Sequence, residues 1–164
     1  MNIYILSNNE KKIEIIKITF QKNYPQILFQ FHFINIPENN KREYFQNEIE
    51  DMALYKIQYL LSNIQKNLNN DDIIISTQTG LKEDINEKNE IIYSEMTTIL
   101  LYYFNRFYHL DSQESIISNK FYSKILQFKK HKFSYKDSNI EDWNPKRFEI
   151  LKNCLNELID NIFH

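Results

Sequence analysis

The start of the chain joins a short apolar strand to an amphipathic helix through a brief polar turn. The segment Asn2 to Leu6 has the composition of a strand, and apolar residues then recur at Ile13, Ile16 and Phe20. Spacings of three and four positions predict a helix with one buried face. A strand that runs directly into such a helix is the first unit of an α/β order of elements, which the rest of the chain continues.

The turn between strand and helix carries small polar side chains and a lysine in the spacing Ser7-x-Asn9-x-x-Lys12. Backbone N–H groups and the positive end of the helix dipole point outward at a helix N-terminus, so an anion such as phosphate is favoured there. A second interpretation needs no ligand, because Ser7 and Glu10 fit the S-x-x-E capping box. The local sequence leaves both interpretations open.

The middle of the chain alternates between strand and helix patterns. Alternating apolar residues predict a strand with one buried face over Gln26 to Ile36, and a helical spacing predicts a long helix from about Glu43 to Asn67. The continuous apolar run within Asp72 to Thr77 predicts a central strand covered on both faces. A β-rich segment from Ile91 to Tyr108 then predicts a hairpin with that strand.

Two helices are expected to complete the fold. Ser118 to Lys130 has the pattern of a short helix, and Lys132 to Asp142 is expected to be irregular, with one strand around Phe133 to Tyr135. Pro145 favours the start of a C-terminal helix. Its apolar stripe comprises Phe148, Leu151, Leu155, Leu158 and Ile162. The order of elements predicts one α/β sandwich domain over residues 1–164, with a mixed sheet and flanking helices.

Composition excludes several functional classes. A formal net charge of −2 argues against general nucleic-acid binding. Cys154 is the only cysteine, so we expect no disulfide framework and a reducing compartment such as the cytoplasm. Strand-forming residues from Asn2 onward predict no cleavable targeting segment, and no apolar run reaches the roughly 18 residues of a membrane span. Because Gly80 is the only glycine, left-handed turn positions are expected to use Asn, Asp or Ser.

Five fragments carry a resemblance to a known family. They are SNNEKKIE (7–14), the Met52 to Lys56 stretch, DDIIISTQTGLKED (71–84), the Ser115 to Leu126 segment, in which Asn119 stands where the family usually has proline, and the Asn144 to Arg147 stretch before the last helix. Together with the order of elements they resemble the inosine triphosphatase-like superfamily, which includes the Maf proteins, and most closely its inosine/xanthosine triphosphatase branch. SNNEKKIE is similar to the family's T/S-x-N-x-x-K opening, and Gly80 falls at a family glycine. The resemblance implies the α/β sandwich already predicted.

The resemblance also implies an activity and residues for it. The family's activity is the dephosphorylation of aberrant purine nucleoside triphosphates. By resemblance, Lys12 would contact phosphate, Ser7 and Asn9 would supply hydrogen bonds, and Lys56 and Arg147 would face the phosphates. Single basic residues on helices are also common as surface charges, so this alternative stays open for Lys56 and Arg147.

The implied chemistry needs Mg²⁺ and a carboxylate. Glu38, in the polar loop after the second strand, is a candidate ligand because Mg²⁺ takes hard oxygen donors, although a solvated loop residue is an equal alternative. The family has an acid two residues before the glycine, and here that position is Gln78. Glutamine cannot act as a base, and the loss of a positioned general base costs about 10² to 10⁴-fold in rate.

Two functions of different classes therefore follow. The first is an inosine/xanthosine triphosphatase-like phosphatase with Gln78 at the position of the expected acid. The second is a catalytically inactive member of the same fold that serves as a structural subunit of a larger assembly. Aromatic residues make up 15% of the chain, and aromatic side chains are enriched at protein interfaces. We therefore expect a homodimer or a subunit of a larger complex.

Overall fold

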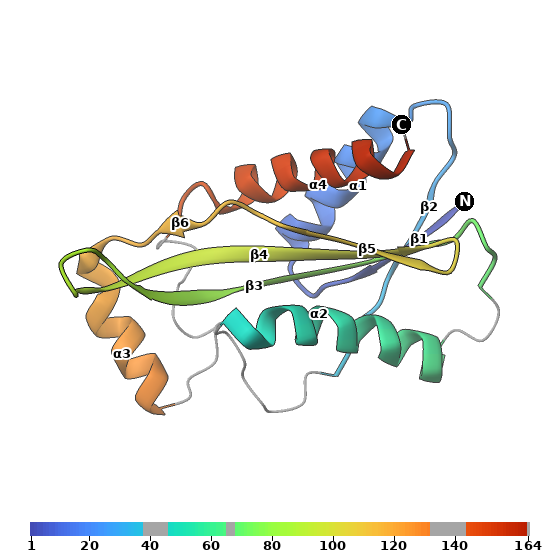
Figure 1. The fold of residues 1–164 in the computed structure, drawn as a ribbon. Helices are drawn as coiled ribbons and strands as arrows, with labels where there is room; N and C mark the ends of the chain where they lie inside the picture. The colour runs from blue at the N-terminus through green and yellow to red at the C-terminus, as the bar shows by residue number, and fades with distance from the viewer. Residues whose placement is uncertain (38–45, 65–67, 132–143, 164) are drawn as a thin grey trace.

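The protein folds around one six-stranded mixed sheet (Figure 1). The computed structural model describes residues 1–37, 46–64, 68–131 and 144–163. Along the chain the elements are β1 (Asn2–Leu6), α1 (Glu10–Asn23), β2 (Gln30–Phe33), α2 (Gln46–Tyr59), the π-helical turn η1 (Leu60–Ile64), β3 (Ile73–Ile85), β4 (Ile91–Tyr103), β5 (Arg106–Asp111), β6 (Ser115–Ile116), the 3₁₀ turn η2 (Asn119–Phe121), α3 (Tyr122–His131) and α4 (Arg147–Phe163).

The sheet has the order β2-β1-β3-β4-β5, and β6 pairs with β4. β1 is parallel to both of its neighbours, β2 and β3, whereas β4 is antiparallel to β3, β5 and β6. β3 and β4 form one long hairpin that extends well beyond β1 and β2 (Figure 1). The predicted α/β class, mixed sheet, flanking helices and hairpin are confirmed.

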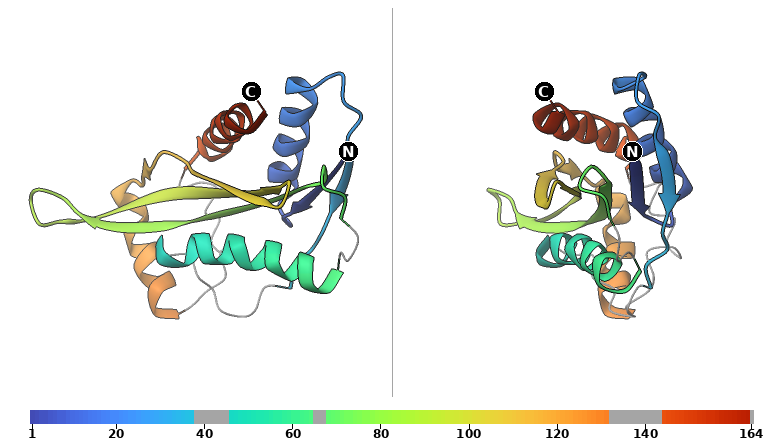
Figure 2. Two further views of the ribbon diagram at one scale, coloured as in Figure 1. Left: turned by 45° about the vertical axis from the view of Figure 1, so that its right-hand side comes forward. Right: turned by 90° about the vertical axis from the view of Figure 1, so that its right-hand side faces the viewer.

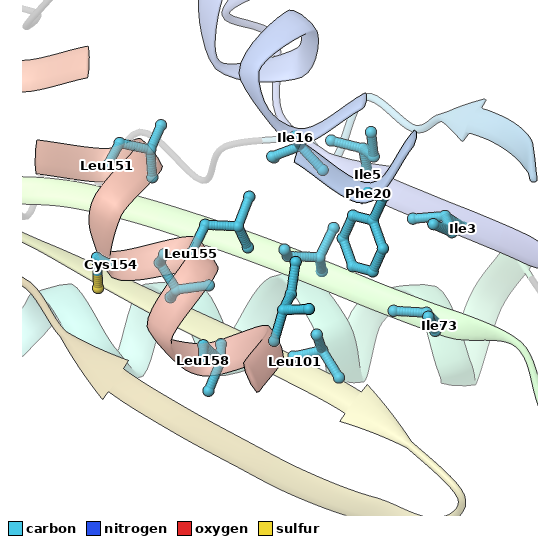
Figure 3. Close-up of a cluster of buried hydrophobic side chains, with 13 residues drawn as sticks. Ile3, Ile5, Ile16, Phe20, Ile73, Leu101, Leu151, Cys154, Leu155 and Leu158 are labelled. Carbon is cyan, nitrogen blue, oxygen red and sulfur yellow. The ribbon is translucent and has the colours of Figure 1, made fainter. Parts of the chain in front are cut away.

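Helices cover both faces of the sheet. α1 and α4 lie on one face and α2 lies on the other (Figure 2). Side chains of a strand point alternately to the two faces, so Ile73 and Ile75 of β3 join the core under α1 and α4 while Ile74 joins the core under α2. Figure 3 shows the first of these cores, which contains Ile3, Ile5, Ile16, Phe20, Ile73, Leu101, Leu151, Leu155 and Leu158.

The predicted stripe of the last helix is confirmed at its centre. Leu151, Leu155 and Leu158 are buried, and Cys154 and Ile159 are buried beside them. The helix begins at Arg147, two residues after Pro145. Within the described residues, no helix is long and apolar enough to cross a membrane.

Three predicted boundaries were wrong. The strand expected over 26–36 is limited to β2, which lies at an edge of the sheet and leaves Phe33 51% exposed. The helix expected to reach Asn67 leaves α-helical geometry after Tyr59 and becomes η1. β3 continues through the polar residues 82–84, because pairing with β4 satisfies their backbone groups.

The prediction that residues other than glycine take the left-handed turn positions is confirmed for asparagine. Among the described residues, Asn89, Phe104 and Asn105 have positive φ, at 60°, 48° and 59°, and Gly80 does not. Phe104 and Asn105 form the two-residue loop between β4 and β5, a position where both residues of a type I′ turn need positive φ. Asn was expected there, and a phenylalanine was not. The strand predicted around 133–135 lies outside the described residues.

Candidate functional site

The turn from β1 into α1 is held by side chains of its own sequence. Asn9 is the N-cap of α1, and its side-chain oxygen accepts a hydrogen bond from the Lys12 backbone N–H at 3.1 Å. The Ser7 hydroxyl accepts from the Asn9 backbone N–H at 3.2 Å, so it supports the turn before the helix begins. The capping box predicted from Ser7 and Glu10 was therefore wrong about the capping residue.

Lys12 reaches the sheet face that α1 and α4 cover. Its ammonium group donates a hydrogen bond to the Thr79 hydroxyl at 2.9 Å. The Thr79 hydroxyl also bonds the hydroxyl of Thr97 at 2.8 Å, its cross-strand partner on β4. Both threonines are buried. The lysine of the opening motif is thus fixed to the centre of the β3 and β4 hairpin.

Lys56 reaches the opposite face of the same strand. It projects from α2, and its ammonium group donates to the Gln78 side-chain oxygen at 3.0 Å. Gln78 directly precedes Thr79, and consecutive residues of a strand point to opposite faces. Lys12 and Lys56 therefore bond consecutive residues of β3 from the two sides of the sheet. Lys56 is 8% exposed, so it is no solvated surface charge.

A small cavity lies at the carboxyl end of β1. It has a volume of about 10 Å³, and its described lining residues are Leu6, Ser7, Asn8, Ile36 and Lys56. Space of about this size holds one water-sized group. The cavity brings together Ser7 and Lys56, which come from distant parts of the sequence.

Several predicted site residues are not among the described residues that line the cavity. Lys12 bonds Thr79 on the other face of β3, and Gln78 bonds the lining residue Lys56. Asn9 caps α1 rather than lining the space. Glu38, the proposed metal ligand, lies outside the described residues.

Arg147 is placed in a buried ion pair with Glu95 of β4. Its Nε donates to Glu95 Oε1 at 2.8 Å, and a second guanidinium nitrogen bonds Oε2. The Asn144 side chain donates to Oε1 at 3.1 Å. The exposed fractions are 5% for Arg147 and 3% for Glu95. Arg147 is therefore bound to β4, and it is not one of the described residues that line the cavity.

Sequence reasoning overlooked Glu95. The signal available was a single carboxylate inside a strand of apolar residues and threonines, at a position that faces the core side of β4. A buried carboxylate needs a partner that supplies charge and hydrogen bonds. Arg147 and Asn144, which flank Pro145 before the last helix, meet that need.

The described part of the site does not fit a magnesium ion. Gln78 contributes an amide whose oxygen accepts from Lys56 and whose nitrogen donates to the Thr79 carbonyl at 3.5 Å. None of the described lining residues carries a carboxylate. In the described ranges no three His, Cys, Asp or Glu side chains gather as a metal site would require. We derive no chemical step through a metal from these residues.

Two buried hydroxyl groups of β3 have no hydrogen-bond partner within the part of the chain that the structure describes. They belong to Ser76 and Thr77, which are 0% and 3% exposed. Buried polar groups are nearly always hydrogen-bonded, so such atoms need an explanation. Both residues immediately precede Gln78 in β3.

A larger depression on the α2 side is acidic. Its volume is about 500 Å³, and the carboxylates at its wall are those of Glu50, Asp51, Asp111 and Glu114. His109 bonds Asp111 at 2.9 Å and lies 3.8 Å from Glu50. A concentration of negative charge repels phosphate groups, so this depression is unsuited to a nucleotide's triphosphate.

Comparisons with known proteins show the fold and no more. No protein-family model matches the sequence, and no curated protein matches it significantly. The crystal structure of protein VC0702 from Vibrio cholerae is similar to this chain, with a TM-score of 0.76 and 12% identity over 99% of this chain and 95% of that one. The likeness shows an α/β fold with a mixed sheet.

Proposed function

We propose that this protein is an inosine/xanthosine triphosphatase-like phosphatase that holds the triphosphate of an aberrant purine nucleotide at the carboxyl end of β1. One observation carries the proposal. Ser7, Asn8 and Lys56 line a single cavity where β1 turns into α1. A lysine ammonium group beside the N-terminus of a helix provides positive charge and hydrogen-bond donors for phosphoryl oxygens.

The sheet explains why the site forms there. β1 pairs with β3 only as far as the match of Leu6 with Ser76, so β1 no longer covers the edge of β3 at Gln78 and Thr79. The β1 to α1 turn begins directly after Leu6. A nucleotide's phosphate chain that runs past the turn can approach Lys56 on one face and Lys12 on the other.

Hydrolysis is expected to be slow. Gln78 occupies the position of the family's acid and binds Lys56 through its neutral amide. A missing general base costs about 10² to 10⁴-fold in rate. In this proposal Mg²⁺ accompanies the triphosphate, with Glu38 as its candidate protein ligand, and the amide of Gln78 contributes no base.

Phosphate release with inosine or xanthosine triphosphate and Mg²⁺ tests the proposal, with ATP as the comparison substrate. Gln78→Glu should raise turnover by about 10² to 10⁴-fold. Lys12→Met should abolish turnover, whereas Lys11→Met should leave it unchanged because Lys11 is exposed and packs on the Phe148 ring. Absence of turnover in both the natural sequence and Gln78→Glu would sink the enzyme proposal.

The second candidate is an inactive subunit of a larger assembly, either a homodimer or a hetero-complex. The hydrogen bond of Lys56 with Gln78 favours this candidate, because a neutral glutamine stands where catalysis would need an acid. If Gln78→Glu creates hydrolysis where the natural sequence has none, the fold has kept its pocket and lost only its chemistry. A native mass in cell extract equal to that of one chain would count against the assembly.

A further inference from the structure

Lys12 is held at both of its ends. Its backbone N–H donates to the Asn9 side-chain oxygen at 3.1 Å, which fixes its place in the first turn of α1. Its ammonium group donates to the Thr79 hydroxyl of β3 at 2.9 Å, so the flexible side chain is also fixed at its charged end. Lys12 and Thr79 are 67 residues apart in the chain, so only the fold brings them together.

The hydroxyl that receives the ammonium group is itself firmly placed. It bonds the Thr97 hydroxyl at 2.8 Å across the β3 and β4 ladder, and both threonines are buried. Ser112 fixes the backbone of Thr97, because its hydroxyl accepts from the Thr97 N–H at 2.9 Å and its own N–H donates to the Thr97 carbonyl at 2.8 Å. A hydroxyl has one donor and two lone pairs, so Thr79 accepts from Lys12 while it bonds Thr97.

We propose that Thr79 is a positioning residue for phosphate binding, which holds the Lys12 ammonium group in place before the nucleotide arrives. The inference rests on the proposed function, in which Lys12 contacts a phosphoryl oxygen. A lysine side chain has much rotamer freedom, and a ligand that must immobilise it loses affinity. An ammonium group carries three N–H donors, and the bond to Thr79 uses one of them. In this role Thr79 acts through Lys12 without touching the nucleotide.

Thr77 provides a matched control within the same strand. It lies two positions before Thr79, so both side chains project to the same face of the sheet. The exposed fractions are 3% for Thr77 and 4% for Thr79. The Thr77 hydroxyl has no partner within the described residues, whereas that of Thr79 bonds Lys12. Thr77→Val therefore removes an equally buried hydroxyl and leaves the contact of Lys12 intact.

The first measurement is calorimetric titration with the Mg²⁺ complex of inosine triphosphate, on the natural sequence and on Thr79→Val, Thr79→Ser and Thr77→Val. Immobilising one long side chain on binding weakens affinity by about 3 to 10-fold, so we expect a loss of this size for Thr79→Val. Thr79→Ser keeps the hydroxyl and should restore the natural affinity. Thr77→Val should leave the affinity unchanged.

The second measurement follows the lysine itself in the nucleotide-free protein. Carbon-13 relaxation of the Lys12 Cε methylene reports the order of this side chain on the picosecond to nanosecond timescale. We expect the order parameter to fall in Thr79→Val and to keep its natural value in Thr77→Val and Thr79→Ser. A merely structural role of Thr79 would not selectively mobilise Lys12.

Each other outcome overturns the inference in a recognisable way. If Thr79→Val binds inosine triphosphate as the natural sequence does, or leaves Lys12 equally ordered, Thr79 does not position the lysine, and the proposed function survives. Equal losses of affinity in Thr79→Val and Thr77→Val would show a general effect of disturbing β3. Absence of binding by the natural sequence would remove the proposed function, and the inference with it.

Discussion

The ion pair between Arg147 and Glu95 allows a quantitative prediction about a residue that the sequence assigned to the nucleotide. Arg147→Met would leave the Glu95 carboxylate buried without the guanidinium group that bonds both of its oxygens. Removal of one partner from a buried ion pair costs about 3 to 5 kcal/mol. We expect Arg147→Met to lower the free energy of unfolding by that amount.

Urea and thermal unfolding measure this cost. In a domain of this size 1 kcal/mol corresponds to roughly 2 to 4 °C, so the midpoint should fall by about 6 to 20 °C. The double variant Glu95→Leu with Arg147→Met should recover most of the loss, because apolar residues of similar volume often replace a buried pair without cost. Lys146→Met is the matched control, since the neighbouring lysine is exposed and such substitutions usually change stability by less than about 0.5 kcal/mol.

The same variant separates a structural role from a ligand-binding role. If Arg147 holds α4 on β4, the double variant should bind inosine triphosphate as the natural sequence does. The reasoning is refuted if Arg147→Met unfolds within about 1 kcal/mol of the natural sequence while its nucleotide affinity collapses. That result would mean that the guanidinium group leaves Glu95 to contact phosphate.

Two further predictions concern groups away from the site. Burial raises the pKa of the Cys154 thiol from 9.0 to about 11, with Glu157 and Asp111 adding to the shift. At pH 8 its thiolate fraction should therefore be about 100-fold smaller than in the unfolded chain. A thiol reagent should then label Cys154 only in urea, and rapid labelling of the folded protein would contradict the prediction. Stability should fall as pH rises from about 9 to 11, because the unfolded thiol loses its proton first. Replacing Phe104-Asn105 by Asn-Gly should raise the free energy of unfolding, measured by urea unfolding, by about 1 to 2 kcal/mol, because Phe104 holds a left-handed conformation. A lower free energy of unfolding would show that the ring contact of Phe104 with Tyr103 matters more.

The sequence predicted the elements whose patterns report burial. The period of α1 and the apolar run of β3 follow from which face packs on the core, and both were placed well. The outer end of β3 could not be predicted this way, because Glu83, Asp84 and Ile85 are all exposed. Its strand conformation depends on pairing with β4, which a pattern of apolar residues does not record.

The roles predicted for the site residues stay predictions, but their placement can be compared with the structure. Ser7 and Lys56 line one cavity, which the carboxyl end of β1 and the last turn of α2 form together. The partner of Arg147 was not predictable, since Glu95 lies 52 residues away in the chain and only the packing of α4 on β4 brings them together. Asn9 could have been chosen as the cap, because asparagine is as good a capping residue as serine.

The placement of the two lysines limits how a ligand could contact both of them. Lys12 bonds Thr79 and Lys56 bonds Gln78, so the two ammonium groups approach β3 from opposite faces. A ligand that contacts both must extend around the end of β1, where β1 no longer pairs with β3. A single phosphate group occupies one side only, whereas a linear triphosphate is long enough to pass from one side to the other. A nucleotide that is held as we propose would therefore have to reach both faces of β3, which Lys12→Met and Lys56→Met would test one face at a time.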